Sequence, residues 1–134
     1  MGSEPIDALL DREARRLVAA LAARSATLST AESLTAGMVS SAVAGVPGAS
    51  SVLRGGAVTY VNEVKERVLG VSARSIAEHT EVSHEVAREM AAGSRRLFGS
   101  DVAVSLTGYA GPGGGTEENP VGTVYIGVSS AAGT

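Results

Sequence analysis

Apolar residues near the start of the chain recur at the spacing of a helix. They occupy positions Ile6, Leu9, Leu10, Leu17, Val18 and Leu21. Apolar positions three or four residues apart fall on one face of an α-helix, and Pro5 stands where the first helical turn tolerates a proline. The pattern therefore predicts an amphipathic helix over residues 6–24.

After this segment, short apolar runs alternate with helix-compatible segments. The expected elements are a strand at 27–30, a helix at 35–44, an extended segment at 52–60, a helix at 62–69, helices beginning near 72 and 83, and strands at 102–106 and 121–129. The glycine pair at 55–56 is expected to interrupt the extended segment. Strands that alternate with helices are typical of α/β domains. We expect one domain over residues 1–134, a three-layer α/β/α structure with a mostly parallel or mixed central sheet.

The composition of the chain argues against several classes of partner and cofactor. A net charge of -3 without a basic stripe argues against a nucleic-acid partner. The chain has no cysteine, and its two histidines are too few for a metal site, so we expect neither a metal nor a cofactor. No apolar run approaches the roughly 18 residues that cross a bilayer, which argues against a membrane partner and favours a cytoplasmic protein. Short helices with small apolar faces favour a homo-oligomer, most simply a dimer.

One lysine stands out among the charged residues. The chain has 11 basic residues, and Lys65 is the only one that is not an arginine. A guanidinium stays protonated in proteins, whereas an ammonium can lose its proton and act as a base. Lys65 is therefore a candidate general base. The alternative is that an arginine-rich composition left one lysine on a solvated helix face, paired with Glu63 or Glu66.

Two loops at predicted strand ends are rich in hydroxyls or glycine. Residues 107–116 form a glycine-rich run after a strand, where free backbone amides can bind a phosphate or carboxylate. A flexible surface hairpin is the competing interpretation. Residues 30–37 also join a strand to a helix, and there Ser33 could simply cap the helix.

A serine near the lysine could be the nucleophile. Ser50 precedes the extended segment that leads to Tyr60 and Lys65. A serine hydroxyl needs a base to remove its proton, and a lysine whose pKa is lowered by burial can supply one. Tyr60 could hydrogen-bond either group. The alternative is that Ser50 only caps a turn.

Taken together, several motifs resemble the CinA C-terminal domain family, the nicotinamide-nucleotide amidohydrolases. They are Ala-Glu-Ser-Leu-Thr-Ala-Gly at 31–37, Gly-Ala-Val-Thr-Tyr-Val-Asn-Glu-Val-Lys at 56–65, Leu-Gly-Val at 69–71, Glu-Val-Ser at 81–83, the glycine-rich run at 107–116 and Pro-Val-Gly-Thr-Val at 120–124. The resemblance covers residues from about Ile6 to the end of the chain. It implies hydrolysis of the carboxamide of nicotinamide mononucleotide to nicotinate mononucleotide and ammonia, with that small molecule as the partner.

The resemblance also implies roles for particular residues. It places Ser50 at the nucleophile position, Lys65 at the base position and Tyr60 beside them as an assisting group. The expected substrate-binding residues are Ser33, Thr35, Thr107, Gly108, Gly111 and Gly114.

The chain departs from the family pattern at three places. Leu34 and Ala36 replace a cysteine and a glycine, and Gly113 replaces an aspartate. The family domain also continues through another strand and helix, which residues 1–134 are expected to lack. These departures leave a second hypothesis open, a nucleotide-binding or regulatory domain that has kept the pocket and lost turnover.

Overall fold

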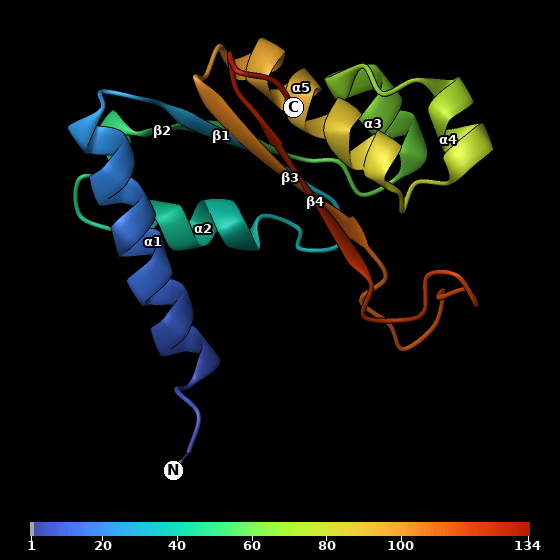
Figure 1. The fold of residues 1–134 in the computed structure, drawn as a ribbon, viewed down its shortest axis with the longest axis horizontal. Coiled ribbons are helices and arrows are strands. Elements are labelled where there is room, and N and C mark those ends of the chain that lie inside the picture. The colour runs from blue at the N-terminus through green and yellow to red at the C-terminus, as the bar shows by residue number, and fades with distance from the viewer. Residues whose placement is uncertain (1) are drawn as a thin grey trace.

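The computed structural model describes residues 2–134. Its elements in chain order are α1 (Ile6–Ala23), β1 (Leu28–Glu32), α2 (Met38–Ala44), the 3-10 turn η1 (Ala49–Ser51), β2 (Leu53–Val58), α3 (Asn62–Leu69), α4 (Ala73–His79), α5 (His84–Phe98), β3 (Val102–Gly108) and β4 (Val124–Ser129). Figure 1 shows α1 and α2 on one side of the sheet and α3, α4 and α5 on the other. The predicted three-layer α/β/α fold is confirmed.

The four described strands form one mixed sheet in the order β2-β1-β3-β4. β1 runs parallel to both β2 and β3, and β4 pairs antiparallel with β3. The three parallel strands therefore direct their carboxyl ends to one edge of the sheet. Loops at this edge are the usual ligand-binding positions in open α/β sheets.

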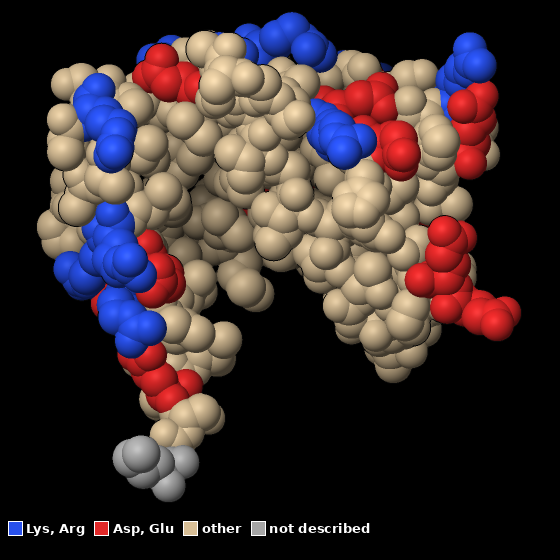
Figure 2. All heavy atoms as spheres, viewed as in Figure 1, with Lys and Arg blue, Asp and Glu red and all other residues tan. Residues whose placement is uncertain are grey.

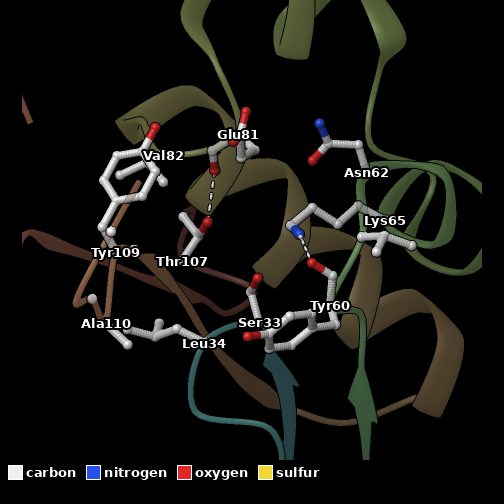
Figure 3. A pocket seen from close by; sticks show the side chains of 14 residues that line it. Ser33, Leu34, Tyr60, Asn62, Lys65, Glu81, Val82, Thr107, Tyr109 and Ala110 are labelled. Carbon is white, nitrogen blue, oxygen red and sulfur yellow. Dashed lines mark hydrogen bonds between the residues drawn. The ribbon is translucent and has the colours of Figure 1, made fainter. Parts of the chain in front are cut away.

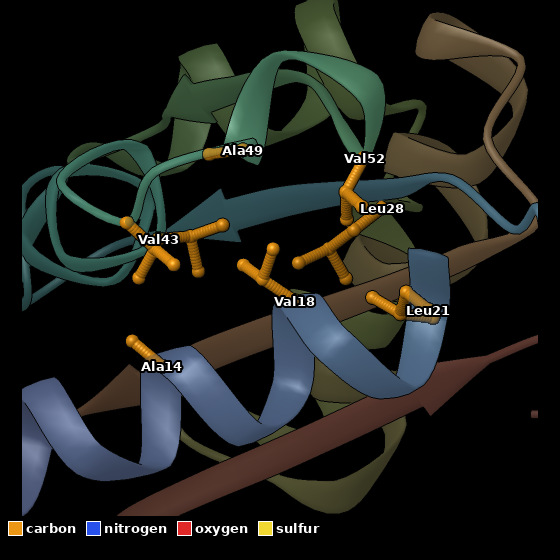
Figure 4. Packing of buried hydrophobic residues seen from close by; sticks show 8 residues of the cluster. Ala14, Val18, Leu21, Leu28, Val43, Ala49 and Val52 are labelled. Carbon is orange, nitrogen blue, oxygen red and sulfur yellow. The ribbon is translucent and has the colours of Figure 1, made fainter. Parts of the chain in front are cut away.

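An apolar core lies between each face of the sheet and the helices packed against it. The α1 side buries Ala14, Val18, Leu21, Leu28, Val43, Val46, Ala49 and Val52, and Figure 4 shows α1 side chains packed against β1 and the η1 segment. The α5 side buries Ala31, Leu69, Val71, Val86 and Met90. Burying a Val or Leu side chain contributes about 1.5–3 kcal/mol, so these clusters hold the helices to the sheet.

The outer face of α1 is charged. Figure 2 shows basic and acidic side chains interleaved along this helix. Its exposed ion pairs include Arg15–Asp11 and Arg16–Glu13. None of the helices in the described part of the chain is long and apolar enough to span a membrane.

Most predicted boundaries shift by a few residues, and three predictions differ for a visible physical reason. The helix expected at 35–44 begins only at Met38, because Ala36 (φ 51°) and Gly37 (φ 100°) adopt left-handed backbone conformations. The glycine pair does not interrupt β2. Gly55 instead makes room for a neighbour, since a Cβ there would lie 2.7 Å from the Phe98 ring. The last strand begins at Val124, after a turn closed by a hydrogen bond from the Thr123 amide to the Pro120 carbonyl (3.0 Å).

Candidate active site

A pocket of about 420 Å³ lies beyond the carboxyl ends of β1 and β2, beside the end of β3. This volume falls within the range of small-molecule sites. The pocket is lined by Ser33, Leu34, Tyr60, Val61, Asn62, Lys65, Glu81, Val82, Thr107, Gly108, Tyr109, Ala110, Gly111 and Gly113. Figure 3 shows Ser33, Tyr60, Lys65 and Thr107 around one space. Segments distant in the sequence thus meet at the predicted edge of the sheet.

Lys65 is buried at this pocket. Only 1% of the residue is exposed, and its Nζ donates hydrogen bonds to the carbonyl oxygens of Thr59 (2.9 Å) and Tyr60 (3.2 Å). Among residues 2–134 no carboxylate lies within ion-pair distance of the amine, and Glu63 pairs with Arg67 instead. The interpretation of Lys65 as a solvated surface residue is therefore wrong.

The surroundings of Lys65 favour its neutral form. Burial lowers the pKa of the amine, and the negative charge of Glu81 opposes that shift without cancelling it. The two carbonyl acceptors hold the nitrogen in place. A fixed amine with a lowered pKa has the properties that a general base requires.

Ser33 follows β1 directly and is 8% exposed. Its amide donates to the carbonyl of Leu106 (3.0 Å), which continues the pairing of β1 with β3 by one residue and fixes the serine at the pocket. The Ser33 hydroxyl forms no hydrogen bond with any residue in the described part of the chain. It is therefore free to interact with a bound molecule.

Glu32, not Ser33, caps α2. The buried Glu32 carboxylate accepts hydrogen bonds from the backbone amides of Val39 (2.8 Å) and Ser40 (3.0 Å) in the first turn of this helix. Burial alone would raise the pKa of Glu32, but the hydrogen bonds from Ser40 and Val39 outweigh burial and leave this pKa below its usual value. The capping interpretation of Ser33 is therefore wrong, and Glu32 ties the segment around Ser33 to the helix.

Glu32→Gln is expected to lower the free energy of unfolding by about 1–3 kcal/mol, because one amide group cannot accept both bonds as a carboxylate does. Urea unfolding at neutral pH measures this change. Since the folded-state pKa is lowered, the contribution of Glu32 is complete above the ordinary carboxyl pKa and is lost as the pH falls through the folded-state value. The difference between wild type and variant should shrink accordingly in acid.

Glu63→Gln is the matched control for this substitution. Glu63 is exposed and, among residues 2–134, pairs only with Arg67, so a change within about 0.5 kcal/mol is expected. Equal effects of the two substitutions would contradict the capping role of Glu32.

Thr107 and the glycine-rich run form another wall of the pocket. The Thr107 hydroxyl donates to the carbonyl of Glu81 (2.6 Å), which links the end of β3 to the turn before α5. Gly108 and Gly111, which the sequence analysis expects to bind substrate, line the pocket. Within residues 2–134, the amides of Ala110 and Gly111 donate to no protein acceptor, so this wall can offer N–H groups to an anion.

Three predicted site residues do not line the pocket. Thr35 and Gly114 lie outside its lining, although Thr35 is close in sequence to Ser33. Ser50 is exposed in η1, before the start of β2, whereas Tyr60 and Lys65 follow the end of that strand. A strand of 6 residues spans roughly 20 Å. The expected pairing of Ser50 with Lys65 is therefore corrected, because β2 separates the two side chains.

The structure also adds residues that were not among the predicted site residues. Asn62, Glu81 and Tyr109 line the pocket beside the predicted residues. Asn62 begins α3, one turn before Lys65, and Tyr109 follows the last residue of β3. Asn62 lies at a predicted helix start and Tyr109 near a predicted strand end, and these positions were the signal in the sequence that could have identified them.

Comparison with known proteins places the chain in a family. The model of the CinA C-terminal domain matches residues 10–134. A CinA-like protein of Anaeromyxobacter sp. (strain K) is 52% identical over 118 residues, which cover 88% of this chain and 29% of that protein. A CinA-like protein of Gemmatimonas aurantiaca is 48% identical over the same number of residues, 28% of its length. The chain thus spans less than a third of these curated relatives.

Solved structures share the fold over nearly the whole chain. A competence/damage-inducible protein from Agrobacterium tumefaciens has a TM-score of 0.91 at 36% identity, covering 100% of this chain and 80% of that one. A CinA superfamily protein from Escherichia coli has a TM-score of 0.89 at 32% identity, covering 98% and 76%. With the matched family model and these relatives, the chain belongs to the CinA C-terminal domain family.

Proposed function

We propose that this domain hydrolyses the carboxamide of nicotinamide mononucleotide, giving nicotinate mononucleotide and ammonia. The observation that carries the proposal is a buried lysine amine without a carboxylate partner, in a pocket that it shares with an unbonded serine hydroxyl. Burying an amine is costly, and buried amines with lowered pKa values concentrate at catalytic sites. The choice of nicotinamide mononucleotide as the substrate comes from the family resemblance.

In the proposed reaction Ser33 replaces Ser50 as the nucleophile. The neutral amine of Lys65 accepts the proton of the Ser33 hydroxyl while Oγ forms a bond to the carboxamide carbon. The protonated lysine then gives this proton to the departing nitrogen, so that ammonia leaves and an ester of Ser33 remains. A water molecule, deprotonated by the same amine, hydrolyses the ester and releases the carboxylate.

Backbone amides can stabilise the charge that develops on the amide oxygen. Among residues 2–134, the amide of Leu34 donates to no protein acceptor, and Leu34 lines the pocket next to the nucleophile. The amide that follows a nucleophilic serine is a frequent oxyanion donor. The free amides at Ala110 and Gly111 are suited to the phosphate of the substrate.

Ammonia release from nicotinamide mononucleotide tests this function. Release is measured with a coupled ammonia assay, and formation of nicotinate mononucleotide is followed by chromatography in the same samples. Equal amounts of the two products are expected. Binding by calorimetry without any release would instead support a domain that has kept the pocket and lost turnover, and absence of both would remove the mononucleotide from consideration.

A further inference from the structure

Two of the residues that line the pocket determine its net charge. Of the 14 lining residues only Lys65 and Glu81 belong to the charged residue types. If Lys65 acts as a base it must be neutral, and the lining then carries one net negative charge from Glu81. Such a pocket favours a ligand whose positive charge lies close to the reacting amide.

Within residues 2–134, the Glu81 side chain forms no hydrogen bond and no ion pair. In the part of the chain that the structure describes, its carboxylate accepts no hydrogen bond and lies within ion-pair distance of no arginine, lysine or histidine. Neighbouring acidic residues differ in this respect, since Glu78 pairs with Arg74. Burying a carboxylate even partly is costly unless a charge or a hydrogen bond compensates for it. A cationic ligand would compensate for it here.

The backbone around Glu81 is fixed from both sides. Thr80 has φ 67° and ψ 166°, a conformation that is unfavourable for a β-branched residue. Its carbonyl accepts a hydrogen bond from the Ser83 hydroxyl (2.9 Å), and the Glu81 carbonyl accepts one from Thr107 (2.6 Å). Asn119 donates to the carbonyl of Val82 (3.2 Å). These bonds hold in place a strained turn that brings Glu81 to the pocket.

Two aromatic side chains complete this environment. Tyr60 and Tyr109 line the same pocket, and Figure 3 shows them apart on its wall, with Ser33 and Thr107 between them in this view and Glu81 to one side. Aromatic faces attract cations and stack on flat rings. A carboxylate and two phenol rings that line one pocket are suited to a cationic aromatic ring.

We propose that Glu81 is the specificity-determining residue of this pocket and selects amides carried on a positively charged ring over neutral rings of the same shape. The inference deepens the proposed function and rests on it for the choice of ligands. Nicotinamide mononucleotide carries such a ring. Its reduced dihydropyridine form has the same carboxamide, ribose and phosphate on a neutral ring, so the two molecules form a matched pair.

The test compares Glu81→Gln with wild type on both molecules. The measured quantity is kcat/KM for the cationic ring divided by kcat/KM for the neutral ring. The two amides differ in intrinsic reactivity, but this difference is the same in variant and wild type and cancels when their ratios are compared. Any effect of the substitution on Lys65 changes kcat/KM for both molecules and cancels within the ratio. We expect this ratio to fall about five- to ten-fold in the variant, the effect of losing one charge contact in a partly solvated pocket.

Glu85→Gln provides the matched control. It removes the same charge four residues later, and Glu85 lines a different pocket, beside His79 and Tyr125. The ratio should not change in this variant. Thermal unfolding of all three proteins verifies that each is folded.

Calorimetry separates this inference from the proposed function. If wild type releases no ammonia from either molecule, dissociation constants replace kcat/KM in the same ratio. A fall confined to Glu81→Gln supports charge selection even when the hydrolase proposal has failed. An unchanged ratio in Glu81→Gln, an equal fall in Glu85→Gln, or failure of wild type to bind either molecule overturns the inference.

Discussion

Ser33→Ala is expected to lower kcat for ammonia release by about 10⁴-fold or more, the loss typical for removal of a serine nucleophile. The substitution deletes one hydroxyl that bonds to no residue among 2–134, so the protein should fold normally. Calorimetry should show that nicotinamide mononucleotide still binds, because the pocket keeps its other walls. Loss of turnover with retained binding is the combination that a nucleophile predicts.

Ser50→Ala is the matched control, since both its position in the sequence and the family resemblance pointed to this residue. Ser50 is exposed before β2 and lines none of the pocket. Its substitution should leave kcat within about two-fold of wild type, the range of surface changes remote from chemistry. The assignment of Ser33 would be refuted if the Ser50 variant lost activity and the Ser33 variant kept it.

Lys65→Arg should inactivate the enzyme by at least about 10³-fold although it keeps a long, basic side chain. A guanidinium stays protonated under all conditions in which proteins are folded, so it cannot accept the proton of Ser33. The bulkier planar group must also fit a space where only 1% of Lys65 is exposed. Steady-state kinetics with nicotinamide mononucleotide measure the loss.

Lys65→Met distinguishes lost chemistry from lost structure. Methionine fills a similar volume without a buried amine, so the variant should be inactive and yet unfold at the same temperature as wild type or higher. Since burial lowers the pKa of Lys65, kcat/KM of wild type should rise with pH through a value below the ordinary lysine pKa of about 10.4. Retained activity in either variant would exclude the lysine from the proton transfers.

Element types were largely predictable from the sequence, because apolar spacing and capping residues are local signals. Ser72 and Ser83 cap the starts of α4 and α5, as their positions indicated. Their side-chain oxygens accept hydrogen bonds from backbone amides of the first helical turn. The glycine pair in β2 was misleading for a physical reason. Gly55 is required by the Phe98 ring of α5, a contact between residues far apart in the chain.

The sequence by itself determined the alternation of strands and helices, the exceptional position of Lys65 and the two loops that border the pocket. It could not determine which serine lies beside the lysine, because distance along the chain does not show which strand ends lie side by side. Ser50 is nearer to Lys65 in the chain, but β2 lies between them, whereas parallel pairing of β1 with β2 brings Ser33 to the same edge. Tertiary structure alone decided this, along with the placement of Glu81, because both depend on which strand ends are neighbours in the sheet.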